Sequence, residues 1–241
     1  MLEIKNLSVE VNGKKILKEI NMKLEKGKVY ALMGPNGSGK TSLANVLMGN
    51  AKYKILSGRI FLDRKDITDF PVNKRAEEGI FVSYQNPVEI SGVSVSNFLR
   101  VAFNSLNKNK ISMLDFQKLL EEKAEELNID KKFLMRYLNE GFSGGEKKQM
   151  EILQMLVLNP NMVILDETDS GLDIDALKTI SKGIKKFIDK NKTVLIITHY
   201  RKILDYIQPD KVFVMMEGKI VAEGEREIID KLEEKGYKGL K

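Results

Sequence analysis

The fold follows from one segment, Val29-Tyr-Ala-Leu-Met-Gly34-Pro-Asn-Gly-Ser-Gly-Lys40-Thr41. Its five apolar residues predict a short buried strand, and residues 40–48 predict a helix. The turn between them has the G-x-x-x-x-G-K-[ST] spacing of a phosphate loop, in the strand–loop–helix context that such a loop requires. A glycine-rich turn that binds nothing is the alternative, and the full spacing with both flanking elements disfavours it.

The chemistry of a triphosphate explains the residue types in this loop. Glycines keep side chains away, so that backbone N–H groups and the helix dipole can surround several negative charges. We expect the Lys40 ammonium to lie against the β- and γ-phosphates, where it also acts in catalysis, and the Thr41 hydroxyl to bind Mg²⁺. The predicted nucleotide-binding residues are Gly34, Pro35, Asn36, Gly37, Ser38, Gly39, Lys40, Thr41 and Ser42.

Patterns on both sides of the loop predict the fold class. Residues 2–11 alternate apolar and polar, and Asn12-Gly13 predicts a tight turn into a second strand. Strands that alternate with helices are typical of a largely parallel sheet covered on both faces, so we expect an α/β fold. Strands are predicted over 59–62, 80–84, 162–165, 194–198 and 212–216, a final hairpin from 216, and helices over 174–189, 201–207 and 225–234.

The middle of the chain differs, because residues 95–105, 114–127 and 131–138 have helical spacing between polar breaks. We therefore predict one domain over 1–241 with a helical subdomain at 86–157. The flanking residues 1–85 and 158–241 would form the catalytic core and its β-subdomain.

Two acidic residues follow the apolar run that begins at Met162. Asp166 and Glu167 are placed to emerge at the carboxyl edge of the sheet, where ligands bind in open α/β folds. We expect Asp166 to hold Mg²⁺ through water, and Glu167 to act as the general base on the attacking water. A surface pair or a helix cap is the alternative, and it is weak beside a phosphate loop.

Two further polar residues also follow predicted strands. His199 is the only histidine and comes directly after the run 194–198, so its side chain could reach the γ-phosphate from the same sheet edge. Gln85 follows the strand at 80–84, and its amide could contact Mg²⁺ or the water and connect the helical insertion to the nucleotide. We predict catalytic roles for both residues, against structural roles as the alternative.

A second anion site is predicted at Ser143, Gly144, Gly145 and Glu146, which precede a helix over 147–158. One nucleotide does not need two such cradles from one chain. The economical arrangement places each ATP between the phosphate loop of one copy and this run of another copy, with Asp173 at the shared interface. Plain helix capping by Ser143 and Asp173 is the alternative, and both roles can hold together.

Composition limits the protein class. The chain has no cysteine, which excludes disulfides, thiolate metal sites and cysteine nucleophiles and fits a reducing cytosol. No apolar stretch approaches the roughly 20 residues that span a bilayer, and the N-terminus resembles neither a signal nor a transit peptide. We expect a cytoplasmic protein without direct membrane insertion. The formal charge is +6, but the lysines are scattered among 34 acidic residues, which disfavours nucleic acid as a partner.

In this combination and order, the motifs resemble those of the ATP-binding-cassette (ABC) ATPases over nearly the whole chain. The resemblance implies a P-loop NTPase cassette, in which a RecA-like core carries an antiparallel β-subdomain and a helical subdomain insertion. It implies ATP and Mg²⁺ as cofactors, with Thr41, Gln85 and Asp166 around the metal. ATP would close two copies head to tail, and hydrolysis to ADP and phosphate would reopen them.

Three segments show a narrower resemblance, to the Suf-type ATPase subunits (SufC): residues 85–93, 166–178 and 198–210. It implies a SufB/SufD-like scaffold protein as partner and a role in iron–sulfur cluster assembly. The ATP-binding subunit of a membrane transporter is the alternative. An ATPase acting on nucleic acid is a third hypothesis, disfavoured because no long heptad-patterned segment interrupts the cassette.

One position departs from the ABC pattern. These cassettes usually stack an aromatic side chain on adenine, and the nearest position here is Val11, ahead of Asn12-Gly13. Stacking on an aromatic residue contributes about 1–3 kcal/mol per base in single-strand binders. By analogy, the affinity for ATP could be about tenfold weaker.

Overall fold

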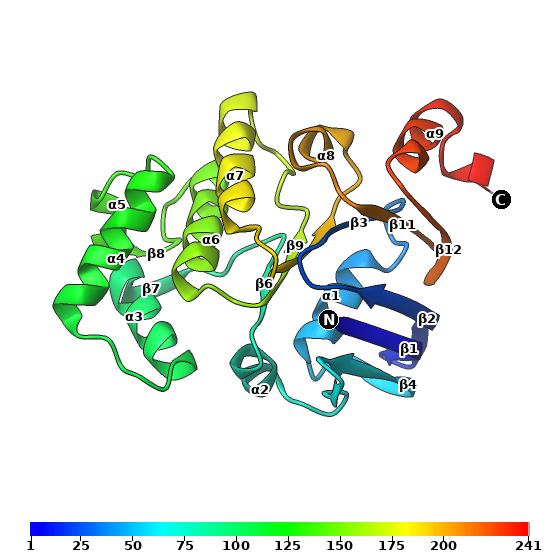
Figure 1. Ribbon diagram of the computed structural model, residues 1–241, viewed down its shortest axis with the longest axis horizontal. Coiled ribbons are helices and arrows are strands. Elements are labelled where there is room, and N and C mark those ends of the chain that lie inside the picture. The colour runs from blue at the N-terminus through cyan, green and yellow to red at the C-terminus, as the bar shows by residue number, and fades with distance from the viewer. Residues whose placement is uncertain (241) are drawn as a thin grey trace. The chain divides into compact units, whose positions relative to one another are not determined.

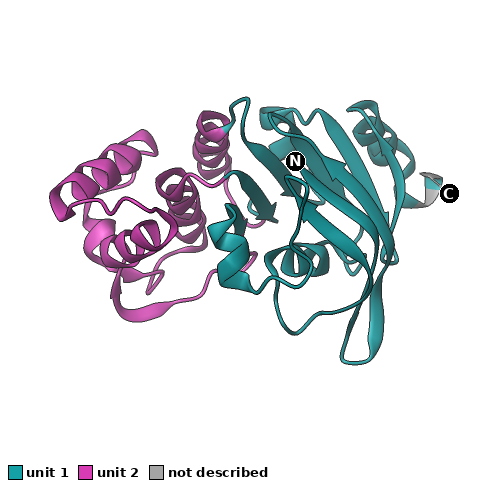
Figure 2. Cartoon of the chain, turned by 60° about the horizontal axis from the view of Figure 1, so that its bottom comes forward, with its two compact units in different colours: residues 1–82, 161–168, 188–241 teal, residues 83–160, 169–187 magenta. Residues whose placement is uncertain are grey.

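The computed structural model describes residues 1–240 (Figure 1). They form two compact units, shown in Figure 2. Unit 1 comprises residues 1–82, 161–168 and the chain from 188 onward, and unit 2 comprises residues 83–160 and 169–187. Within these residues no helix is both long and apolar enough to cross a bilayer.

Unit 1 contains the predicted parallel sheet. Strand β10 (Thr193–Ile197) pairs in parallel with β3 (Val29–Met33) and β9 (Met162–Asp166). Strand β11 (Lys211–Met216) pairs in parallel with β3, and β12 (Lys219–Gly224) is antiparallel to β11. Every residue of β3, β9 and β10 is buried, as expected for strands covered on both faces. The α/β fold is confirmed. The strand order is β12 (Lys219–Gly224), β11 (Lys211–Met216), β3 (Val29–Met33), β10 (Thr193–Ile197), β9 (Met162–Asp166) and β6 (Ile80–Ser83).

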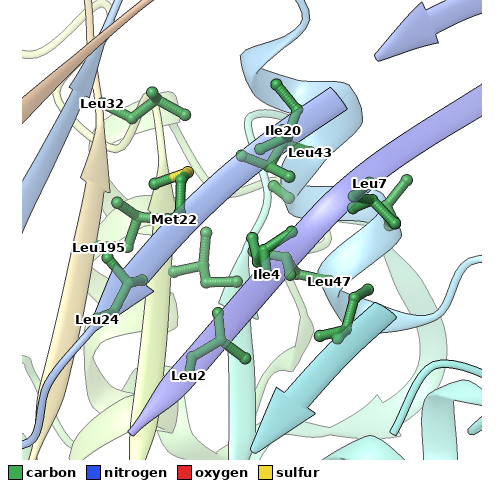
Figure 3. Packing of buried hydrophobic residues seen from close by; sticks show 14 of the residues in the cluster. Leu2, Ile4, Leu7, Ile20, Met22, Leu24, Leu32, Leu43, Leu47 and Leu195 are labelled. Atoms are coloured by element: carbon green, nitrogen blue, oxygen red, sulfur yellow. The ribbon is translucent and has the colours of Figure 1, made fainter. Parts of the chain in front are cut away.

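A second, antiparallel sheet in unit 1 has the order β2 (Lys14–Leu24), β1 (Leu2–Val11), β4 (Lys54–Leu62), β5 (Lys65–Asp66). The predicted hairpin is confirmed, since Val11 pairs with Lys14 across Asn12 and Gly13, both at positive φ. The apolar face of this sheet and the central sheet share one core cluster with α1 (Lys40–Met48). Figure 3 shows ten of its residues by label: Leu2, Ile4, Leu7, Ile20, Met22, Leu24, Leu32, Leu43, Leu47 and Leu195.

A short helix that the sequence patterns did not predict, α2 (Val72–Glu77), carries a buried arginine. The Arg75 guanidinium donates hydrogen bonds to the backbone carbonyls of Phe70, Val46, Leu47 and Thr68 at 2.7–2.9 Å. Two of these carbonyls, those of Val46 and Leu47, belong to the last turn of α1, where most carbonyls lack a partner within the helix. The Val46 carbonyl also accepts from Gly49 N–H at 3.0 Å. Burial lowers the pKa of Arg75 to about 10. Arg75 therefore ties the end of α1 to α2.

We expect Arg75→Met to lower the free energy of unfolding by about 3 kcal/mol or more, because each buried carbonyl left without a donor costs about 1 kcal/mol or more. The matched control is Arg59→Met, which removes an exposed ion pair with Asp66 and should cost about 1 kcal/mol or less. Urea unfolding followed by circular dichroism measures both variants. Equal losses in the two variants would contradict the role of Arg75.

The remaining helices of unit 1 are α8 (Arg201–Ile207), α9 (Glu227–Lys235) and a short 3₁₀ turn, η1 (Tyr237–Leu240). Helix α9 is bound to α8 by Arg201, whose guanidinium lies 2.8 Å from Asp230 and 2.6 Å from Glu233. Helix α9 begins two residues later than the helix predicted over 225–234, and the 3₁₀ turn η1 was not predicted.

Unit 2 is mostly helical, as its spacing predicted. Serines cap three of its helices: Ser94 accepts from Asn97 N–H, Ser112 from Asp115 N–H and Ser143 from Glu146 N–H. Its helices are α3 (Val95–Leu106), α4 (Met113–Glu126), α5 (Lys132–Met135), α6 (Gly144–Leu158) and α7 (Ile174–Phe187).

Two differences from the sequence patterns concern unit 2. The helix predicted over 131–138 ends at Met135, because Arg136 is extended (ψ 160°) and the next two residues form β8 (Tyr137–Leu138) against β7 (Ile90–Ser94). Helix α7 groups with this unit instead of the core, because it packs on α6 and its Lys186 pairs with Glu126 of α4. The sequence-based boundaries of 86–157 miss this second segment.

Candidate nucleotide site

The glycine-rich loop lies in unit 1 between β3 and α1, in the predicted strand–loop–helix order. Gly39 directly precedes α1 at φ 110°, a conformation that favours glycine. No side chain among the described residues caps this helix, and its first turn has no acidic residue. The helix N-terminus thus keeps its positive dipole end for an anion.

The loop is packed against the turn between β11 and β12. A Cβ on Gly34 would lie 2.2 Å from the Met215 carbonyl oxygen, so no other residue fits there. The Gly218 N–H donates to the Ser38 carbonyl at 2.9 Å, and the Ser38 N–H donates to the Pro35 carbonyl at 3.2 Å. These contacts fix the shape of the loop.

Lys40 is buried in this loop, with 4% of its surface exposed. Its ammonium donates to the carbonyls of Gly34 at 2.8 Å and Pro35 at 3.1 Å. Burial lowers the pKa of Lys40, and the carboxylates of Glu167 and Asp166 oppose that shift. The ammonium is therefore held over the loop by carbonyls and balanced by two nearby acids.

The predicted metal ligands of unit 1 lie together. The Thr41 hydroxyl donates to Asp166 Oδ1 at 3.3 Å, although 125 residues separate them in sequence. Asp166 is fully buried at the end of β9, where it is level with Ile197 of β10. A hydroxyl and a carboxylate are hard oxygen donors, which fit Mg²⁺.

Glu167 has an unusual backbone for its residue type, with φ 50°. Its N–H donates to the Ile197 carbonyl at 2.9 Å, which holds the turn against β10. A non-glycine residue in this region costs of order 1–3 kcal/mol and persists only where its surroundings impose it. Such strain is common at functional sites, and here it directs an almost buried carboxylate, 8% exposed, toward the carboxyl edge of the sheet.

His199 meets Glu167 at this edge, with 3.4 Å between His199 Nδ1 and Glu167 Oε1. The ring also lies on Tyr200, with centroids 3.8 Å apart. Thr198, the residue before His199, is held in place because its N–H donates to the Leu32 carbonyl of β3. The structure therefore brings together the five predicted side chains of unit 1: Lys40, Thr41, Asp166, Glu167 and His199.

The other predicted site residues belong to unit 2. Ser143 caps α6 in a full capping box: its hydroxyl accepts from Glu146 N–H at 3.3 Å, and Glu146 Oε2 accepts from Ser143 N–H at 2.7 Å. Asp173 caps α7 by accepting from Ala176 N–H at 2.7 Å. Gln85 is exposed after β6. The capping alternative is thus present at Ser143 and Asp173, while the nucleotide contacts of these residues remain predictions.

Gly144 is the open part of this run. A Cβ added there would meet nothing within 4 Å, and Gly145 would meet only Ala176 and Leu172 at 3.9 Å. The start of α6 therefore presents bare backbone, as a second anion cradle requires.

Sequence reasoning missed one polar pair on this helix, Lys148 and Glu151, which are both buried. Their three-residue spacing on a mostly apolar helix is the signal that could have found them.

Comparison with known proteins gives the family. The model of the family described as "ABC transporter" matches residues 17–170. A "Probable ATP-dependent transporter ycf16" of Trieres chinensis is 49% identical over 100% of this chain and 98% of its own length. "Vegetative protein 296" of Bacillus subtilis (strain 168) is 48% identical over 100% of this chain and 93% of its own length.

Solved structures agree on the fold. A dimeric ATP-binding cassette in a post-hydrolysis state with ADP and phosphate has a TM-score of 0.82 at 20% identity, over 93% of this chain and 98% of that one. An ADP conformation of a cassette from an ABC transporter has a TM-score of 0.80 at 29% identity, over 100% of this chain and 97% of that one. With nearly half of its residues identical to full-length relatives, the chain belongs to the ABC transporter family and is an ABC-type ATPase, which hydrolyses ATP to ADP and phosphate.

Proposed function

We propose that this ATPase depends on Mg²⁺, dimerises on ATP and drives a conformational change in a SufB/SufD-like scaffold during iron–sulfur cluster assembly. The observation that carries the catalytic part is the meeting of Thr41, Asp166, Glu167 and His199 at one sheet edge, beside the Lys40 ammonium. The scaffold part rests on the resemblance of residues 85–93, 166–178 and 198–210 to Suf-type subunits.

The phosphate loop would bind the triphosphate through the residues 34–42. Lys40 gives up its bonds to the Gly34 and Pro35 carbonyls and donates to β- and γ-phosphate oxygens instead. Both sets of acceptors are oxygens, so the buried ammonium stays paired throughout the exchange. The Thr41 hydroxyl and Asp166 would hold Mg²⁺, with Gln85 as a further oxygen donor. Mg²⁺ neutralises charge on the phosphate oxygens when bound.

Glu167 then acts as the general base on the attacking water. Its fixed backbone limits where the carboxylate can lie. His199, whose Nδ1 is 3.4 Å from Glu167 Oε1, would donate to the γ-phosphate from the same edge. In the dimer, the other copy supplies Ser143, Gly144, Gly145, Glu146 and Asp173. The bare backbone at Gly144 is the feature of unit 2 that favours this role.

We place the scaffold on an apolar surface of unit 2 made of Val88, Met135 and Tyr137, whose side chains are 74%, 69% and 49% exposed. Tyr137 is opposite Ser94 in the β7–β8 pair, and the Val88 carbonyl accepts from Asn139 at 2.8 Å, so all three belong to one neighbourhood. A cavity of about 380 Å³ beside Met135 and Tyr137 also has Arg136 and Glu140 in its wall. An apolar patch with a charged rim is typical of a protein interface.

A transporter subunit is the second candidate, since the Trieres chinensis relative is named a probable ATP-dependent transporter. A tagged Glu167→Gln chain with Mg-ATP, used to capture partners from soluble and membrane fractions, separates the two. We expect a soluble subunit that shows iron–sulfur absorption after cluster reconstitution. Val88→Asp should abolish its capture, while Val221→Asp, an exposed valine of β12 in unit 1, should not. Capture of a polytopic membrane protein would move the function to transport.

A further inference from the structure

The residues on both sides of Gln85 are bound to elements that flank the signature run Ser143–Glu146. Before Gln85, the Ser83 hydroxyl donates to Glu151 Oε2 at 2.8 Å and the Tyr84 N–H donates to Glu151 Oε1 at 2.9 Å. Lys148 donates to the Tyr84 carbonyl at 2.5 Å. Glu151 and Lys148 both lie on α6, the helix that starts at the signature run.

After Gln85 the chain is held again. The Asn139 amide donates to the Val88 carbonyl at 2.8 Å, and Lys147 pairs with Glu89 at 2.7 Å. Asn139 is buried, lies four residues before Ser143 and has φ 61°, so its position is itself constrained. Segment 83–89 is therefore fixed at each end to residues on either side of the signature run, all within unit 2.

The centre of these contacts is a buried ion pair. Lys148 and Glu151 are each 5% exposed, and Lys148 Nζ lies 3.2 Å from Glu151 Oε2. Burial raises the pKa of Glu151, while Lys148 and the bonds from Ser83 and Tyr84 oppose that shift. A buried pair is weak evidence for stability, because desolvation offsets most of the attraction, so its value here lies in the geometry that it imposes.

We propose that Glu151 is a positioning residue for ATP hydrolysis: it holds Ser83 and Tyr84 on α6 and thereby sets the position of the Gln85 amide relative to the signature run. The proposal rests on the catalytic role proposed for Gln85. Its consequence is that segment 83–89 and α6 move as one body, so that a shift of the signature run shifts Gln85 equally.

Steady-state ATPase kinetics test this with two variants. Glu151→Gln keeps an oxygen that can accept from Tyr84 N–H but loses the charge that pairs with Lys148. Lys148→Met/Glu151→Leu removes the ion pair and the side-chain bonds to Ser83 and Tyr84 without leaving a buried charge unpaired. A misplacement of about 1 Å can cost about 100-fold in rate. We expect kcat to fall about 10- to 100-fold in the double variant and less in Glu151→Gln, with the KM for ATP within about twofold of wild type.

A double-mutant cycle with Gln85→Ala shows whether Glu151 acts through Gln85. We expect Gln85→Ala/Glu151→Gln to be no slower than Gln85→Ala alone. Leu120→Ala is the control for a purely structural effect, since it removes a buried side chain of α4, a helix of the same unit that supplies none of the bonds described above for segment 83–89. It should lower the melting temperature and leave kcat unchanged.

Three results would decide against the inference. The positioning role would be overturned if the kcat losses of Gln85→Ala and Glu151→Gln multiplied in the combined variant. It would also be overturned if Lys148→Met/Glu151→Leu left kcat unchanged. An equal fall of kcat in Leu120→Ala would reduce Glu151 to a stability residue. An unchanged kcat in Gln85→Ala alone would instead remove the role proposed for Gln85, so the two failures are distinguishable.

Discussion

The Glu167→Gln variant should bind ATP normally and hydrolyse it at least about 10²–10⁴-fold more slowly than the wild type. The amide has the size of the carboxylate but cannot take a proton from the attacking water. The change should leave the fold intact, because the strained backbone at φ 50° is held by the bond from Glu167 N–H to Ile197, which the side chain does not make.

Phosphate release measures the rate, and light scattering with Mg-ATP measures the dimer that should accumulate when hydrolysis cannot reopen it. Glu217→Gln is the matched control: this glutamate of unit 1 also has φ 50°, but it is exposed in the turn between β11 and β12. It should hydrolyse ATP at the wild-type rate. If Glu167→Gln also does so, the general-base role of Glu167 is wrong.

Lys40→Ala should abolish ATP binding. The ammonium is buried in the loop with two carbonyl partners, so in the bound state it would face the phosphates in a site with little water. Electrostatic attraction is stronger there than at the surface. Alanine removes the only side-chain cation that the structure places inside this loop among residues 1–240.

Thermal unfolding with and without Mg-ATP measures this loss. A ligand at 100 times its Kd stabilises the native state by about 2.7 kcal/mol. Mg-ATP should therefore raise the melting temperature of the wild type by several degrees and leave that of Lys40→Ala unchanged. Lys15→Ala, at an exposed lysine of β2, should gain as much as the wild type. If Mg-ATP raised the melting temperature of Lys40→Ala as much as that of the wild type, the loop would bind ATP without its lysine.

Local sequence patterns were sufficient for the parts of the fold that depend on local geometry. Gly39 takes a backbone conformation that glycine favours, and Asn12-Gly13 forms the tight turn that its residue types prefer. The apolar runs became buried strands with the expected neighbours. Each of these features depends on residues close together in the chain, so the sequence carries the whole signal.

The sequence also indicated which polar residues follow strands, and the parallel sheet then placed Asp166 and His199 at the same edge. It could not show that Glu167 would be strained or that His199 would lie 3.4 Å from it. Those properties depend on Ile197 and on the register between β9 and β10, which only the paired strands establish.

Tertiary structure alone decided the remaining features. Residues 137–138 pair with β7 in place of extending a helix, because Ile90, 48 positions earlier in the chain, is available as the strand partner of Leu138. Arg75, Lys148 and Glu151 are buried although their residue types favour the surface. The sequence thus determined the local elements and the order of the site residues, because backbone preference and periodicity act over a few neighbours. Burial of a charge is determined by distant carbonyls and counter-ions, which come together only when the chain is folded.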